Sequence, residues 1–150
     1  MSDDPRSRAQ RRRDTEDRLT HDGDVWVASA SADGAPYLVP LSHDWDGEAL
    51  LVATPAKSPT GRNLAATRTA RLALGHTRDA SMIDGDVEVL EIDELPQQQA
   101  DRFAARTGFD PRQLATPYRW FRITPRRIQA WREENELRDR ELMRDGRWLV

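Results

Sequence analysis

The chain has 150 residues, enough for one domain with a core of its own. Its formal net charge is −3, with 23 Lys and Arg against 26 Asp and Glu, which argues against a general nucleic-acid-binding surface because such surfaces favour positive charge. It has no cysteine, which excludes disulfides and thiolate metal ligands, and no apolar run near the roughly 20 residues of a membrane helix. The N-terminus also lacks the apolar core of a signal peptide, so we expect a soluble, cytoplasmic protein.

Residues 1–18 (MSDDPRSRAQRRRDTEDR) carry six Arg and five acidic residues, with very few apolar side chains. Such a segment cannot bury enough apolar surface to fold alone. We therefore expect a solvated tail or a frayed helix that precedes a domain at 19–150. The alternative is an arm that contacts RNA or DNA, and the interleaved acidic residues weaken that interpretation.

The next section predicts consecutive strands. Residues 25–30 (VWVASA) are rich in β-formers, and residues 37–45 follow after the turn sequence SADGAP. Asp46 and Gly47 form a hairpin signal before a return strand at 48–54. Pro40 cannot donate a ladder hydrogen bond, so its strand should be an edge, a bulge or a barrel rim.

A short helix is predicted after residue 58, with Ser58 as its N-cap and Pro59 in its first turn. The clearest helix signal lies at 96–108, which opens with a proline and stops at a glycine. The remaining segments predict strands and a C-terminal hairpin: residues 71–76, a bent strand or one half of a hairpin at 81–92, residues 118–124, residues 127–131 after Pro125, and the hairpin around Asp145 and Gly146.

Six or seven short strands with one late helix indicate a mainly β fold. The pattern is typical of a small antiparallel β-barrel with α-helical additions rather than of a doubly wound sheet.

Few side chains suggest catalytic chemistry of their own. His21, His43 and His76 lie far apart and lack metal-ligand spacing, so we expect no metal site. The chain has no Gly-x-Ser-x-Gly elbow, no Walker loop and no Rossmann glycine fingerprint. If the protein is an enzyme, a cofactor should therefore supply the chemistry.

Residues 57–63 gather a cluster of polar and cationic side chains at the start of the short predicted helix. Backbone N–H groups and the positive end of the helix dipole favour an anion there, and arginine can bind a phosphate with two hydrogen bonds. The residues alone equally allow a capped, solvated loop. The cluster consists of Lys57, Ser58, Thr60, Arg62 and Asn63.

The order of these segments resembles the pyridoxamine 5′-phosphate oxidase-like, flavin-binding split-barrel family and its flavin/deazaflavin oxidoreductase relatives. The resemblance spans about residues 25–131. The matching stretches are VWVASASADGAPYLVPL, LLVATPAKSPTGRNLAATRTARLALG, MIDGDVEVLEI and YRWFRITPRRIQAW. The fuller basic signature of the true pyridoxamine phosphate oxidases is missing, so vitamin B6 oxidation is not assigned.

The resemblance implies a homodimer of six-stranded antiparallel split β-barrels, with two cofactors in clefts between the subunits. It implies FMN as the cofactor, with the deazaflavin coenzyme F-420 as the alternative. The cofactor phosphate would lie at Lys57, Ser58, Thr60, Arg62 and Asn63. The ring system would lie along Val39, Pro40, Leu41 and Thr54, with Trp120 of the second subunit on its other face.

Three hypotheses about function follow. The first is an FMN-dependent oxidoreductase that transfers a hydride or electrons to a small organic acceptor or to oxygen, with a deazaflavin-dependent reductase as its variant. The second is a protein that binds flavin, deazaflavin or haem without turnover. The third is an interaction protein whose arginine-rich N-terminus binds a nucleic acid.

Overall fold

Six long strands carry the fold in the computed structural model, which describes residues 4–150. They are β1 (Asp24–Ala30), β2 (Pro36–Ser42), β4 (Leu50–Pro55), β5 (Thr69–His76), β6 (Asp79–Glu91) and β7 (Tyr118–Trp131). Three short strands extend the same sheet: β3 (Asp44–Trp45), β8 (Glu141–Arg144) and β9 (Arg147–Trp148).

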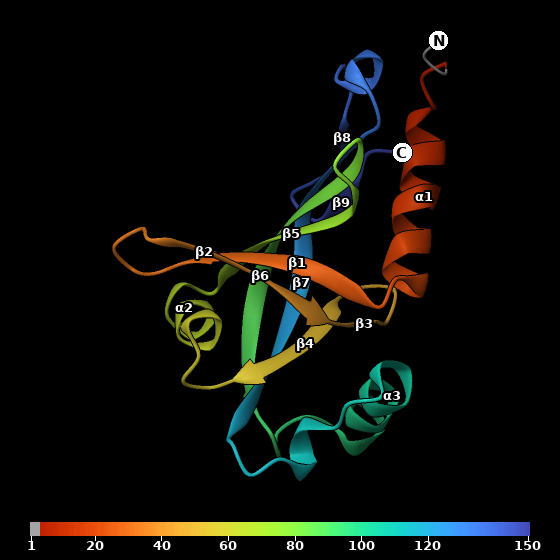
Figure 1. Cartoon of the computed structure of the whole chain (residues 1–150). Helices are drawn as coiled ribbons and strands as arrows, with labels where there is room; N and C mark the ends of the chain where they lie inside the picture. Colours follow the sequence, from red (N-terminus) through yellow and green to blue (C-terminus); the bar gives the residue numbers. More distant parts are fainter. Residues whose placement is uncertain (1–3) are drawn as a thin grey trace.

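Neighbouring strands pair antiparallel in the order β2-β1-β5-β6-β7-β4-β3, and β8 joins β7 to β9. The sheet curls into a half-barrel (Figure 1). This confirms the predicted mainly β, split-barrel fold, with the six expected strands as its long members.

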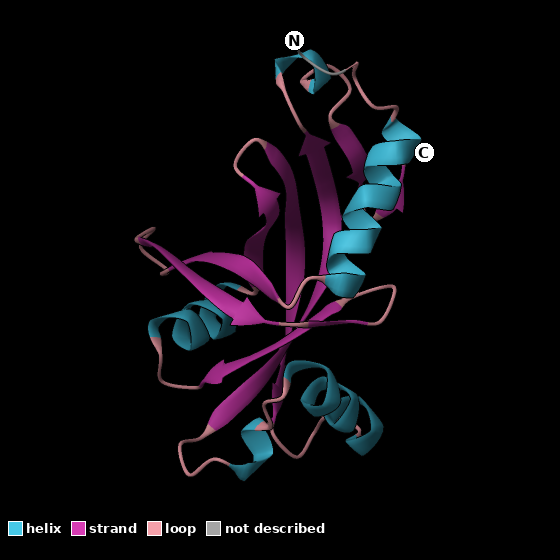
Figure 2. Cartoon of the chain, turned by 45° about the vertical axis from the view of Figure 1, so that its right-hand side comes forward, coloured by secondary structure: helices cyan, strands magenta, loops and turns pink. Residues whose placement is uncertain are grey.

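Three helices lie around the sheet: α1 (Arg8–His21), α2 (Pro59–Thr67) and α3 (Gln97–Thr107). Two single-turn 3₁₀ helices, Pro111–Gln113 and Glu134–Glu136, lie in the connections. Helix α1 runs along the part of the molecule that carries β8 and β9, while α2 and α3 lie toward the other end (Figures 1 and 2). The helices predicted after residue 58 and at 96–108 are therefore confirmed.

Strand β7 is continuous through Pro125, although the proline was expected to separate two strands. The register shifts between Asp84 and Gly85, so that Arg126 is an extra residue opposite β6. Such a bulge tolerates a proline and bends the strand. Gly85 permits the close approach, because a Cβ there would lie 2.5 Å from Ile123 Cγ2. Residues 81–91 therefore form a bent strand, and β6 shares the bend with β7.

Strand β2 forms one end of the main path of the sheet. Its neighbour in the sheet is β1, where Trp26 pairs with Pro40. This confirms the edge position that the proline predicted.

Two apolar cores lie on opposite faces of β4 and β7. Alternation along a strand sends successive side chains to opposite faces, so Val52 and Phe121 enter the barrel, whereas Ala53 and Trp120 face α3. The second core packs α3 against the sheet and contains Leu51, Ala53, Leu95, Ala100, Phe103 and Trp120.

The N-terminal segment differs from the expected solvated tail. Residues 8–21 form a helix in which Arg11, Thr15 and Leu19 are buried against the barrel. The expected boundary between residues 18 and 19 therefore falls inside α1. Residues 1–3 of the expected tail lie outside the described residues.

Polar contacts, rather than an apolar stripe, attach α1 to the barrel. Arg11 Nη1 donates to Ala130 O at 2.9 Å, and the hydroxyls of Thr15 and Ser81 lie 2.7 Å apart. All six arginines of residues 4–18 donate hydrogen bonds within the chain: Arg6, Arg8, Arg11, Arg12, Arg13 and Arg18.

An ion pair fixes the segment before α1 to the 3₁₀ turn after β7. Arg6 Nη2 lies 2.8 Å from Glu136 Oε1, and the Glu136 side chain is 0% exposed. The Arg6 backbone N–H also donates to Glu136 Oε2 at 2.7 Å, and the Arg132 N–H donates to Oε1 at 2.8 Å. Although burial opposes the charge of the carboxylate, these donors outweigh it and lower the pKa of Glu136 to about 2.

We predict that Glu136 makes folding stability depend on pH below about 4.5. Because its pKa is lower in the folded state, its contribution is complete above its ordinary value of 4.5 and is lost as the pH falls toward 2. The contribution is about 3 kcal/mol. Chemical denaturation should show a free-energy gap between wild type and Glu136→Gln at pH 6 that narrows steadily below pH 4.5 as the pH falls toward 2. The exposed neighbour Glu134→Gln is the control, and an equal gap for both variants would contradict the assignment.

Candidate functional site

A hollow of about 250 Å³ lies where β2 and β4 face the region of α3. Three of the predicted ring-site residues, Pro40, Leu41 and Thr54, line it together. Apart from the Tyr118 phenol its lining has no ionisable side chain, so it suits a flat, uncharged ring system. The other lining residues are Ser42, Ala53, Pro55, Phe103, Phe109 and Tyr118.

The start of α2 follows directly from β4, which forms one wall of this hollow. Thr54 Oγ1 and Ser58 Oγ lie 3.3 Å apart. Ser58 caps the helix as predicted: its Oγ accepts from the Gly61 N–H at 3.0 Å and donates to Pro55 O at 2.8 Å. The Ser58 hydroxyl is therefore already engaged within the chain.

Lys57 and Arg62 differ from the other polar residues around the start of α2. Both are exposed, and within residues 4–150 neither side chain has a hydrogen-bond or ion-pair partner. They flank the first turn of α2, where backbone N–H groups lack partners within the helix. This turn therefore combines two free cations with the positive end of a helix.

Thr60 lies in the same turn and is only 2% exposed. Its Oγ1 is enclosed and has no hydrogen-bond partner among the described residues. A buried hydroxyl without a partner is unfavourable by roughly 1–3 kcal/mol. The first turn of α2 therefore lacks one polar partner, which a water molecule or an anion oxygen could supply.

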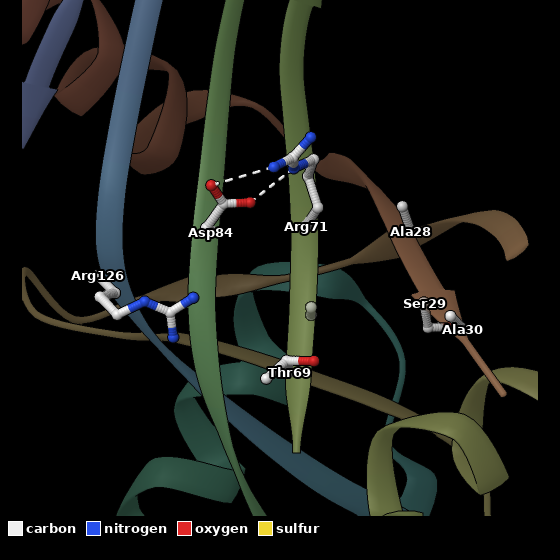
Figure 3. Close-up of a pocket in the computed structure, with 8 residues that line it drawn as sticks. Ala28, Ser29, Ala30, Thr69, Arg71, Asp84 and Arg126 are labelled. Atoms are coloured by element: carbon white, nitrogen blue, oxygen red, sulfur yellow. Dashed lines mark hydrogen bonds and ion pairs between the residues drawn. The ribbon is translucent and has the colours of Figure 1, made fainter. Parts of the chain in front are cut away.

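The Asn63 side chain contacts β1 rather than the other polar residues of this turn. Its Nδ2 donates to Ser29 Oγ at 3.2 Å. Ser29 lines a second, shallower hollow of about 420 Å³ between β1, β5, β6 and β7 (Figure 3). Its cationic groups are neutralised: Arg71 Nε lies 2.6 Å from Asp84, its direct cross-strand neighbour, and Arg126 pairs with Asp86. This second hollow is thus a weaker anion site than the start of α2.

Trp120 lies in the second core, beneath α3. It is 0% exposed, its Nε1 donates to Ile92 O at 3.2 Å, and its ring meets Phe103 edge-on at 5.1 Å. Within one copy the Trp120 ring is therefore enclosed, and its contact with a cofactor bound by a second copy stays a prediction. Val39 packs against the main core and is not among the residues that line the hollow.

Sequence reasoning missed the aromatic wall of the hollow. Phe103 comes from α3, Phe109 follows it, and Tyr118 begins β7, with the rings of Phe109 and Tyr118 5.6 Å apart. No local sequence pattern distinguishes a core aromatic residue from one that also borders a hollow.

His43 is fully buried, and His21 and His76 lie at exposed positions. Across residues 4–150, no group of three or more His, Asp or Glu side chains is arranged to hold a metal ion. Of the helices in that range, none is both long and apolar enough to cross a membrane.

Comparison with known proteins gives one family match. The model of the family described as "Pyridoxamine 5′-phosphate oxidase" matches residues 14–132. This range contains the hollow, the start of α2 and all of α3. No curated protein matches the chain.

Several solved structures share the fold at low sequence identity. An F420 reductase has a TM-score of 0.58 at 18% identity, over 75% of this chain and 94% of its own. HupZ of Group A Streptococcus has a TM-score of 0.62 at 18% identity, over 80% and 93%. General Stress Protein 26 of Bacillus anthracis has a TM-score of 0.57 at 17% identity, over 83% and 95%. At such identities these likenesses concern the fold alone.

We predict that Gly61→Ala displaces the start of α2. A Cβ at Gly61 would lie 2.3 Å from Pro55 O and 3.0 Å from Ala56 O, so the helix or the loop must move. Overpacking of this kind lowers the free energy of unfolding by roughly 1–3 kcal/mol, which thermal or chemical denaturation can measure. Gly23→Ala is the control because no atom lies within 4 Å of its added Cβ. Equal stability of the two variants would show that the loop yields freely.

Proposed function

The chain belongs to the pyridoxamine 5′-phosphate oxidase family, and from this membership we propose that it is a flavin- or deazaflavin-dependent oxidoreductase with FMN as its cofactor. Two copies would share the cofactor in a cleft, and the acceptor would be a small organic molecule or oxygen. The deazaflavin coenzyme is the alternative cofactor, and the fold shared with an F420 reductase keeps it in the test below.

One observation carries the proposal: an uncharged hollow lies beside a cationic helix start. The hollow borders Thr54, and Thr54 contacts Ser58 at the cap of α2. Lys57 and Arg62 beside that cap have no partners in the described chain. A molecule with a flat apolar ring and a phosphate matches both parts, since a phosphate suits free cations at a helix N-terminus.

The small size of the hollow supports a second copy in this proposal. Its volume of about 250 Å³ is below the roughly 300–1,000 Å³ typical of complete ligand pockets. Pro40 lines the hollow and pairs with Trp26, so its side chain shares one face of β1 and β2 with Trp26 and Leu38. On that face Trp26 is 49% and Leu38 59% exposed. A second copy seated there would cover these side chains and close the cleft.

The chain's own groups hold and orient the cofactor in this proposal. When bound, the flavin or deazaflavin supplies hydride-transfer chemistry. Lys57 and Arg62 bind its phosphate, and the rigid walls formed by β2 and β4 fix the plane of its ring. The aromatic side chains Phe103, Phe109 and Tyr118 exclude water from one side. No side chain of the hollow is assigned a proton-transfer step.

The first test is the visible spectrum of the purified protein with added FMN or deazaflavin. We expect a bound chromophore that remains after gel filtration, and reduction of it by a nicotinamide donor would separate an enzyme from a storage protein. Retention of neither chromophore would overturn the proposal.

We predict that Lys57→Ala combined with Arg62→Ala weakens FMN binding roughly ten-fold or more, since a charged hydrogen bond contributes roughly 1.5–3 kcal/mol.

Two controls isolate the phosphate contact. Arg78→Ala removes an exposed cation elsewhere and should leave FMN affinity unchanged. Lys57 is the only lysine of the chain, so an amine-directed reagent reports on it alone apart from the N-terminal amine. FMN should protect Lys57 from labelling, whereas riboflavin, which lacks the phosphate, should not. Equal protection by both ligands would argue against a phosphate contact.

We predict that Leu38→Glu converts a dimer to a monomer, because it places a charge in the apolar face formed by β1 and β2. Light scattering coupled to gel filtration measures the mass of each species. Leu137→Glu is a matched control, with 41% exposure in the connection between β7 and β8. A wild-type protein that is monomeric at micromolar concentration would contradict the shared cleft.

A further inference from the structure

Helix α3 forms part of the wall of the hollow through Phe103, and two arginines of the same helix tie it to other elements. Arg102 Nη2 lies 3.0 Å from Asp44 Oδ2 and donates to Trp45 O at 3.2 Å. Arg106 reaches further: its Nη2 donates to Leu19 O at 2.9 Å and to the backbone oxygen of residue 22 at 3.0 Å. Arg106 therefore joins α3 to the C-terminal end of α1.

The acceptor at this junction is one of the free carbonyls at the end of α1. The last four carbonyls of a helix have no partner within it, and they carry the negative end of its dipole. The N–H of Asp22 satisfies Arg18 O. Leu19 O instead accepts from two side chains, Arg106 Nη2 and His43 Nε2, the latter at 2.9 Å. The Leu19 carbonyl at the end of α1 is thus bonded both by α3, through Arg106, and by the connection before β3, through His43.

His43 is fully buried, and its Nδ1 is enclosed without a partner among the described residues. Because Leu19 O accepts a hydrogen bond, Nε2 carries the proton of the neutral ring. Burial lowers the pKa of His43 below its usual value of 6.5, and the nearby charge of Arg106 lowers it further. The hydrogen bond to Leu19 O and the charges of Asp22 and Asp44 oppose this shift. Arg106, Asp22 and Asp44 are the charges that face the ring, from α3, from the end of α1 and from β3.

Protonation of His43 would disturb this junction for geometric reasons. The second proton would sit on Nδ1, where no acceptor is available, and a buried donor without an acceptor is unfavourable. The imidazolium would also lie beside the Arg106 guanidinium, with both groups donating to the same Leu19 oxygen. Repulsion between the two cations at this shared oxygen acts on the Arg106 hydrogen bond, which is the contact that joins α3 to α1.

We propose that Arg106 is a positioning residue that holds α3, and with it one wall of the hollow, against the end of α1. Protonation of His43 releases this contact, so that ligand binding in the hollow weakens in mild acid. The part that concerns ligand binding rests on the proposed function. The part that concerns α3 stands on the contacts alone, and it can be measured without a cofactor.

The test uses the full chain and compares Arg106→Gln with Arg102→Gln at pH 7.5. Arg102 is the control because its side chain is 52% exposed, lies one turn earlier on α3 and contacts β3 rather than α1. Hydrogen-exchange protection of residues 97–107 should fall in Arg106→Gln and stay near wild type in Arg102→Gln. FMN affinity should fall roughly three- to thirty-fold in Arg106→Gln. Arg106→Lys, which keeps a charged donor, should recover part of both.

The acid response is tested with His43→Gln, which keeps an N–H donor of similar reach but does not titrate. Between pH 7.5 and 5.5, protection of residues 97–107 should fall in wild type and stay constant in both His43→Gln and Arg106→Gln. An unchanged acid response in His43→Gln would overturn the proposal, as would wild-type protection in Arg106→Gln. If wild type binds neither FMN nor deazaflavin, the proposed function fails, while these exchange measurements still decide the role of Arg106.

Discussion

The structure depends above all on the antiparallel pairing of β7 with β6 on one side and β4 on the other. Burial of both faces of β4 and β7 creates two cores from one pair of strands, one inside the barrel and one beneath α3. The bulge at Gly85 and Arg126 bends the β6–β7 pair, and this curvature allows a single sheet to enclose the first core. The hollow lies at the edge of the second core, where β4 leaves the sheet.

Four polar residues around the start of α2 divide into two groups once the chain is folded. Ser58 and Asn63 are satisfied by Gly61, Pro55 and Ser29, so their role is to hold α2 in place. Lys57 and Arg62 remain free. A fold that fixes a helix start with neutral groups and leaves its cations unused has the arrangement expected of an anion site.

Helix α1 shows how a charged segment can be part of a fold. Besides Leu19 in the core, its buried residues are Arg11 and Thr15, and each meets a polar partner far along the chain, as does Arg6 just before the helix. The same helix offers its last carbonyls to His43 and Arg106. Through these contacts the N-terminal segment is connected to α3 and, through Phe103, to the wall of the hollow.

The sequence by itself determined the strand pattern, the edge position of Pro40, the cap at Ser58 and α3, because alternation, proline and caps act over a few residues. Only the tertiary structure decided that α1 docks, that β7 runs through Pro125 and that Trp120 is buried. A docked arginine such as Arg11 looks like a solvated one until its distant carbonyl is known, and a buried tryptophan looks like an exposed one. The hollow likewise exists only where β2, β4 and α3 meet.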